Sequence, residues 1–149
     1  MPIRCEIVSQ DRLVFEGDAD IVLVPGSAGL MGILPNHAPL LSTLKMGVLT
    51  VRREGQEHVF TISGGVIEVQ PDIITVMADA AENVAEIDIA RAEAARKRAE
   101  ELLAKGPGPD TDTYLALEAA IKRSNLRIEV ARRFRGHRSQ YGGSGSETK

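Results

Sequence analysis

The first half of the chain alternates between short apolar segments and polar turns. From Ile3 to Ala78, Val- and Ile-rich runs of about four to eight residues are separated by turn-forming residues roughly every 8 to 12 residues, which is typical of an all-β sandwich or barrel. We therefore expect a sandwich of about 8–10 short strands. The candidate strands are Arg4–Ser9, Arg12–Glu16, Asp20–Val24, His37–Leu44, Gly47–Arg53, His58–Ser63, Val66–Val69 and Ile73–Met77.

Turn chemistry is densest between Val22 and Leu41. This stretch holds three closely spaced glycines, three prolines (Pro25, Pro35 and Pro39) and an Asn-His pair. Glycine permits positive φ, and proline fixes φ and lacks an N–H donor, so a helix is excluded here. We expect folded-back short strands that contribute to a core through Ile33, Leu34, Ala38, Leu40 and Leu41. Two further breaks, which we expect to separate strands, fall at 45–47 and at Gly64-Gly65.

The apolar period changes to that of a helix after a connector at residues 79–86. Asp88 is the expected N-cap of a first helix over Ile89–Leu103, whose apolar positions are mostly alanine. Glycine and proline at 106–109 end that helix. A second helix, capped by Asp110, Thr111 or Asp112, then runs to about Phe134. Two amphipathic helices with a short connection should lie antiparallel, and the narrow alanine seam predicts a hairpin of marginal stability.

The predicted fold class is therefore α+β, with an N-terminal all-β sandwich followed by a C-terminal antiparallel two-helix hairpin. We expect a sandwich domain over 1–84, a helical hairpin domain over 87–135 and a disordered tail over 136–149, where glycine, serine and charge dominate. Charge divides in a similar way. Residues 1–86 hold 5 Lys and Arg against 12 Asp and Glu, whereas residues 87–149 hold 13 against 9, which gives −7 and +4 within the total of −3.

Composition narrows the function classes. The single cysteine, Cys5, excludes an internal disulfide and is expected to fill a small core position. The three histidines lack metal-ligand spacing, and neither a nucleophile elbow nor a phosphate loop is present. The acidic first half argues against a nucleic-acid partner. The sequence thus predicts a protein that is not an enzyme and that has no catalytic or metal site.

Several motifs, in order along the chain, resemble one known family. The run GLMGILPNHAPLLSTLKMGVLTV from Gly29 is followed by Ser63-Gly64-Gly65, by Glu68-Val69-Gln70-Pro71 and by Ile87-Asp88-x-x-Arg91-Ala92. This order is similar to that in the epsilon subunit of bacterial and chloroplast F-type ATP synthases, over roughly residues 3 to 134. The resemblance implies a non-catalytic rotor subunit of the central stalk that links the gamma subunit to the c-ring and regulates ATP hydrolysis through its helices.

The resemblance also implies two sets of site residues. The glycine-rich region belongs to the end of the sandwich that meets the rotor neighbours, so Leu30, Met31 and His37 are expected interface residues; from the residues alone, His37 is expected to pack or hydrogen-bond locally. Many family members carry an acidic residue at the Leu30 position, so an apolar contact is expected there. The Ile-Asp-x-x-Arg-Ala motif implies regulatory ATP binding, with or without magnesium, by Asp88, Arg91, Ala92, Arg123 and Arg127.

The resemblance implies that no cofactor is required. It also implies that the alpha and beta catalytic subunits become partners when the hairpin extends. The expected location is peripheral, on the cytoplasmic face of a bacterial plasma membrane or the stromal side of a thylakoid membrane. The sequence has no apolar run of the roughly 18 residues that a membrane span needs. The alternative from the residues alone is a stand-alone β-sandwich module that binds a ligand or a protein, with the helices as a cover.

Overall fold

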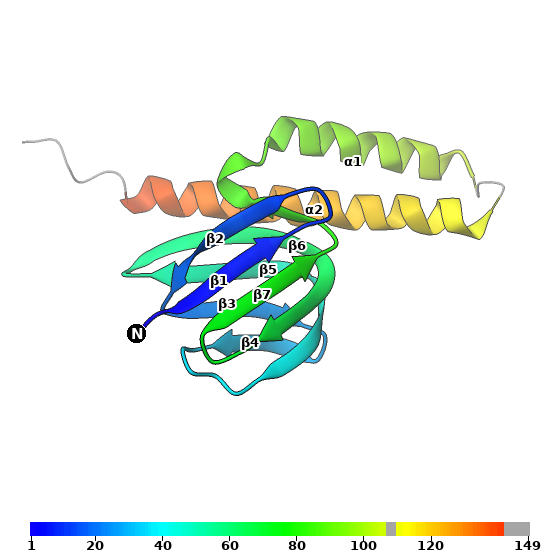
Figure 1. Cartoon of the computed structure of the whole chain (residues 1–149). Coiled ribbons are helices and arrows are strands. Elements are labelled where there is room, and N and C mark those ends of the chain that lie inside the picture. The colour runs from blue at the N-terminus through cyan, green and yellow to red at the C-terminus, as the bar shows by residue number, and fades with distance from the viewer. Residues whose placement is uncertain (107–109, 142–149) are drawn as a thin grey trace, which may run out of the picture. The chain divides into compact units, whose positions relative to one another are not determined.

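The structure, a computed structural model, describes residues 1–106 and 110–141. The chain divides into two units, Met1–Glu86 and Ile87–Lys149. Strands make up most of the first unit, and two helices make up the described part of the second (Figure 1). The predicted fold class, a β-sandwich followed by two C-terminal helices, is confirmed.

The described part of the first unit is an eight-stranded sheet folded into two layers. Its path is β2-β1-β7-β6-β5-β3-β4, with β8 pairing on β6. The β1–β7 pair is parallel and the other pairs are antiparallel. A 3₁₀ turn, η1 (Val84–Glu86), follows the last strand. The strands are β1 (Ile3–Val8), β2 (Leu13–Ala19), β3 (Ile21–Gly26), β4 (Gly29–Ile33), β5 (Leu40–Arg53), β6 (Gln56–Val69), β7 (Ile73–Ala78) and β8 (Ala81–Asn83).

Strands β5 and β6 are continuous over 14 residues each, so the predicted breaks at 45–47 and at Gly64-Gly65 are wrong. The glycines bend β6 without ending it, with φ of +98° at Gly64 and +134° at Gly65. Before the bend β6 pairs with β8, and after it with β7. One strand therefore contributes to both layers.

Two strands were missed in the sequence. Strand β4 lies inside the glycine-rich stretch, and β8 lies in the segment predicted as a connector. Strand β4 ends the path of the sheet, where its pairing partner is β3. The predicted strand from His37 in fact begins at Leu40, because residues 34–37 form a turn in which the His37 N–H donates to the Leu34 carbonyl at 3.2 Å.

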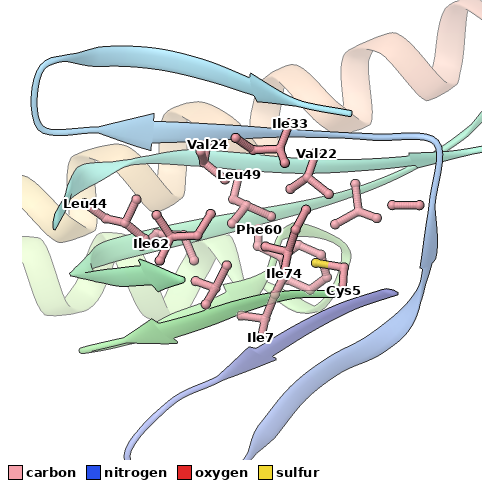
Figure 2. Packing of buried hydrophobic residues seen from close by; sticks show 14 of the residues in the cluster. Cys5, Ile7, Val22, Val24, Ile33, Leu44, Leu49, Phe60, Ile62 and Ile74 are labelled. Carbon is pink, nitrogen blue, oxygen red and sulfur yellow. The ribbon is translucent and has the colours of Figure 1, made fainter. Parts of the chain in front are cut away.

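Buried side chains from the two layers meet in one core (Figure 2). Phe60 and Leu49 lie in its middle, and both are fully buried. Cys5 is fully buried there as well, as expected, and burial raises the pKa of its thiol to about 12. Each buried Val, Leu, Ile or Phe side chain contributes roughly 1.5–3 kcal/mol. The other members of the cluster are Ile3, Ile7, Ala19, Val22, Val24, Ile33, Leu44, Val51, Ile62, Ile67, Val69, Ile74, Val76 and Ala78.

The second unit contains α1 (Ile89–Ala104) and α2 (Thr111–Tyr141). Helix α2 reaches Tyr141, whereas the sequence placed its end near Phe134 and a tail at 136–149; residues 142–149 lie outside the described residues. A single glycine such as Gly136 costs a helix only about 1 kcal/mol relative to alanine. One glycine is therefore a weaker stop signal than the prediction assumed.

Two glycines with positive φ, Gly65 in the bend and Gly55 in the β5–β6 turn, provide a matched test of the bend. A Cβ atom at Gly65 would lie 2.2 Å from the Met77 carbonyl oxygen, whereas a Cβ at Gly55 (φ +79°) meets nothing within 4 Å. We expect Gly55→Ala to lower the free energy of unfolding by about 1 kcal/mol through backbone strain alone. Gly65→Ala should cost about 3 kcal/mol or more, because strain and overlap add. Urea unfolding of both variants measures the difference, and equal losses would contradict the account.

Candidate functional site

The β3–β4 hairpin positions the first set of predicted interface residues. Its turn is tight because a Cβ at Gly26 would lie 2.9 Å from the Gly29 carbonyl oxygen. At the tip, the Ser27 N–H donates to the Thr43 carbonyl at 3.0 Å, and the two hydroxyl groups lie 2.6 Å apart. These bonds attach the tip to β5, so the strand that follows is held in a fixed register.

Leu30, Met31 and His37 have different surroundings. Leu30 is 73% exposed on β4, whereas Met31 is half-buried and packs against the core. The Nδ1–H of His37 donates to the Ala38 carbonyl at 2.7 Å, which is the local hydrogen bond expected from the sequence. Of these three side chains, Leu30 is therefore the one that presents a large apolar surface to solvent.

The core prediction for this region was partly wrong. Ile33 is buried and Leu40 packs against the core, but Ala38 is exposed, and so are Leu34 (57%) and Leu41 (71%). Successive residues of a strand point to opposite faces, so a buried Ile33 directs its neighbour outward. Leu34 thereby continues the outer face on which Leu30 lies. Strict alternation of inward and outward side chains, applied to the glycine-rich stretch, would have identified Leu34 and Leu41 as exposed.

An open groove of about 600 Å³ lies beside these residues. The Asn36 N–H donates to the Pro71 carbonyl at 3.0 Å, which attaches the turn after β4 to the groove wall. On that wall, Gln70 Nε2 donates to Glu68 Oε1 at 3.0 Å. The surface thus combines exposed leucines with one oriented amide–carboxylate pair. The groove is lined by Pro39, Leu40, Leu41, Glu68, Val69, Gln70 and Pro71.

The second set of predicted site residues lies on the helices. Asp88 is the N-cap of α1, and its Oδ1 accepts a bond from the Arg91 N–H at 3.1 Å. Ala92 is fully buried in the seam, whereas Arg91 and Arg123 are exposed. Asp88 therefore acts as a cap, which leaves the exposed arginines as the groups that can contact a ligand.

Interhelical bonds fix how far apart these arginines lie. Arg132 pairs with Glu93, and Arg96 Nη1 donates to Asn125 Oδ1 at 3.2 Å, so the helices are antiparallel as predicted. This register places Arg127 roughly 8 Å and Arg123 roughly 13 Å along the axis from the level of Arg91, at 1.5 Å per residue. The structure thus brings Arg91 closer to Arg127 than to Arg123.

The polar groups with shifted pKa values serve local structure. At the β5–β6 turn, Asp20 accepts bonds from the Glu54 N–H and from Arg53 Nη1, both at 2.8 Å, and these two bonds lower its pKa. Asp110 accepts from the Thr113 N–H at 2.6 Å, which makes it the cap of α2 and lowers its pKa. In the part of the chain that the structure describes, no group of three or more His, Cys, Asp or Glu side chains is arranged to hold a metal ion.

Both units match known protein domains. Residues 2–84 match the family described as "ATP synthase, Delta/Epsilon chain, beta-sandwich domain", and residues 85–132 match "ATP synthase, Delta/Epsilon chain, long alpha-helix domain". A β-sandwich domain followed by a helical domain is the domain arrangement of these ATP synthase subunits. The chain belongs to the ATP synthase delta/epsilon chain family.

Individual relatives agree with the domain matches. The ATP synthase epsilon chain of Pelotomaculum thermopropionicum is 49% identical over 102 residues, which cover 68% of this chain and 76% of the relative. That of Dehalococcoides mccartyi is 42% identical over 135 residues, which cover 91% and 96%. Among solved structures, a chain of the Euglena gracilis mitochondrial ATP synthase, described as OSCP/F1/c-ring in rotational state 1, matches with a TM-score of 0.70 at 25% identity, covering 87% of this chain and 81% of that one.

Membrane association in this family is peripheral. Among the described helices, neither α1 nor α2 is both long and apolar enough to cross a bilayer.

The cap of α2 makes the hairpin sensitive to acid. Because the folded-state pKa of Asp110 lies below its ordinary value of 3.8, the stabilisation is complete above that value and is lost as the pH falls through the lower, folded-state pKa. We expect the Thr113 amide resonance to shift, and its hydrogen exchange to accelerate, below about pH 4. Asp110→Asn, which caps without titrating, is the control and should show neither change. Identical pH profiles for the two proteins would contradict this assignment.

Proposed function

We propose that the chain is a non-catalytic rotor subunit of an F-type ATP synthase, in which the β-sandwich links the gamma subunit to the c-ring. Membership of the epsilon family over both units supports this role, as does the similarity to a chain from an assembly described as containing F1 and a c-ring. The observation that carries the proposal is the difference in exposure between the core of the sandwich and the outer face of its β3–β4 hairpin. A fully buried core lies behind a hairpin whose outer face carries Leu30.

The exposed leucines are the proposed docking surface. Leu30 and Leu34 lie on the outer face of the β3–β4 hairpin and the turn after it, and we assign them to an apolar contact with the c-ring. His37, in the same turn, is the proposed polar neighbour. Met31 supports this surface from within, because its side chain packs against the core. Burying a leucine that is exposed in the free subunit contributes roughly 1.5–3 kcal/mol to association.

A non-catalytic role agrees with how the polar side chains are used. Asp88 and Asp110 cap helices, Asp20 holds a turn, and His37 bonds to its own loop. His58 lies against Phe15, with ring centroids 5.2 Å apart. The chemistry of the complex is thus assigned to other subunits. A stand-alone ligand-binding module remains the second candidate, favoured only by the groove beside Leu41. Capture of purified gamma as a one-to-one complex would decide for the rotor subunit.

The helical hairpin is the proposed regulatory element. Closed, it leaves rotation free; opened and extended along gamma, α2 reaches the alpha and beta subunits and blocks ATP hydrolysis. Support comes from the narrow seam, in which α1 buries only the small side chains Ala92 and Ala99 as fully as the core. A seam that buries little apolar area separates at a small free-energy cost. The complex would work at the cytoplasmic face of a bacterial plasma membrane, with the stromal side of a thylakoid as the alternative.

ATP is the proposed ligand of the closed hairpin, bound without hydrolysis and with or without magnesium. Arg91 and Arg123 are exposed, and among the residues that the structure describes neither guanidinium pairs with a carboxylate. With Arg127 they give the hairpin three cations, of which Arg91 lies near Asp88 and Ala92 along α1. Guanidinium groups suit phosphate oxygens, and a ligand that binds only the closed state stabilises that state by mass action.

Removal of the helices tests the regulatory role. The cut belongs after Glu86, where the first unit ends, because Val84 in η1 is 1% exposed and a cut before it would leave the sandwich incomplete. We expect the assembled complex with the shortened subunit to hydrolyse ATP several-fold faster while ATP-driven proton pumping persists. Assembly is checked by subunit stoichiometry in both complexes. Equal hydrolysis rates would remove the hairpin as a brake and leave the linking role intact.

Nucleotide binding is tested on the isolated subunit by titration calorimetry with millimolar ATP, with and without magnesium. We expect heat from the unmodified chain and at least about a tenfold weaker affinity after Arg91→Gln with Arg127→Gln, because charge-assisted bonds to phosphate are lost. Arg133→Gln is the matched control, since Arg133 pairs with Glu129 along α2 and should leave the affinity unchanged. No heat from the unmodified chain would refute ATP as the ligand.

A further inference from the structure

The helical hairpin closes over a seam that offers little apolar area. Ala92 and Ala99 are the buried residues of α1, and the buried residues described in α2 are Ile128, Val130, Ala131 and the polar Ser124. Alanine removes little surface from water, so apolar burial gives this pair of helices far less than the core gives the sandwich. Polar contacts between the helices therefore have a larger share in holding them together.

In the part of the chain that the structure describes, polar contacts from α2 reach α1 and also the residue that leads into it. Arg96 bonds Asn125 in the middle of the hairpin, and Arg132 pairs with Glu93 nearer its open end. At the open end itself, Arg135 Nη2 donates to the Ile87 carbonyl at 2.7 Å. Arg132 and Arg135 are three residues apart, so they lie on one face of α2 and act on the same end of α1.

The Arg135 contact differs from the other two in what it satisfies. Ile87 precedes the cap residue Asp88, and the first intrahelical bond runs from the Ala92 N–H to the Asp88 carbonyl. The helix ladder therefore leaves the Ile87 carbonyl without a partner of its own. The Ile87 side chain is 1% exposed, and the bond from Arg135 is partly buried. A partly buried carbonyl that loses a charged donor is costly, because little water replaces the lost bond.

The Glu93–Arg132 ion pair should stabilise the closed hairpin less than the Arg135 contact does. The two side chains are 39% and 61% exposed, so water and salt screen their attraction. This pair adds a component to closure that depends on ionic strength, whereas the Arg135 contact is largely independent of salt. The two contacts thus differ in a way that an experiment can separate.

We propose that Arg135 is a latch that holds the hairpin closed by capturing the Ile87 carbonyl, with Glu93–Arg132 as a second, salt-sensitive contact. The inference rests on the proposed function in one respect, namely that the hairpin opens. The proposed latch adds to that function the place at which the hairpin begins to open. Opening begins where α1 enters the hairpin, at the first residues of the second unit.

The test measures the distance between the helices in the full chain. Spin labels are placed at Lys97→Cys and Lys122→Cys, two exposed positions away from the latch. Native Cys5 is fully buried with a pKa of about 12 and does not compete for the label. We expect Arg135→Ala to raise the ratio of open to closed hairpin about tenfold, seen as a population at longer distance. Arg135→Lys, which keeps a charged donor, should restore most of the closed population.

Arg133→Ala is the matched control. Arg133 is on the same helix two residues away and pairs with Glu129 of α2 itself, so the substitution makes the same change in helix propensity without touching α1. It should leave the distance distribution within about twofold of the unmodified chain. Equal open populations in Arg135→Ala and Arg133→Ala would overturn the latch, because the effect would then belong to α2 alone.

Charge reversal tests the second contact. Glu93→Arg should open the hairpin in part, and Glu93→Arg with Arg132→Glu should close it again, with the difference shrinking in high salt. Failure of the double variant to close would remove this pair from the proposal. If Arg135→Ala opens the isolated chain but its complex hydrolyses ATP at the unmodified rate, the latch stands and the proposed brake fails. If the labels stay close in Arg135→Ala, the latch is wrong whatever the hydrolysis rate.

Discussion

The sandwich depends on the bend in β6 at Gly64-Gly65. Both residues have φ in a region that favours glycine, and the Gly65 backbone passes so close to the Met77 carbonyl that any side chain would overlap with it. Because the strand bends there and continues, the residues before the bend pair with β8 and those after it pair with β7. One 14-residue strand thereby belongs to both layers, and Phe60 before the bend and Ile67 after it are buried in the same core.

The helical unit is built on a different balance. On α1 it buries only alanine, on α2 it buries Ser124 beside Ile128, Val130 and Ala131, and arginine side chains provide bonds between the helices. Apolar contacts are not directional, so they tolerate small shifts of the helices. A hydrogen bond such as that from Arg135 to the Ile87 carbonyl requires a particular distance and angle, so it is either made or broken. Under the proposed latch, a unit held by a few such bonds would change between two discrete states and would not loosen gradually. Low local stability of this kind is typical of elements that move.

The sequence predicts the fold class because the change from strand to helix periodicity is unambiguous, and Asp88 is correctly identified as a cap because capping is local. Errors arise where the decisive contact is distant. Gly65 looks like a break until the Met77 carbonyl is seen beside it. The error at Leu34 and Leu41 was of another kind, because local strand alternation, had it been applied, would have placed both side chains outside the core. The Arg135 contact depends on the interhelical register, to which an alanine-rich sequence gives little guide.

The different roles proposed for the two units agree with the different amounts of apolar surface that they bury. A subunit that transmits torque must not yield under load, and a core of fully buried side chains that includes Phe60 and Leu49 resists deformation because its interior is close-packed. A regulatory arm must yield to a modest input, and ligand binding at a hundredfold above its dissociation constant supplies only about 2.7 kcal/mol. An apolar seam as large as the sandwich core would exceed that input, so the regulatory role that we propose requires the smaller buried apolar area that the hairpin has.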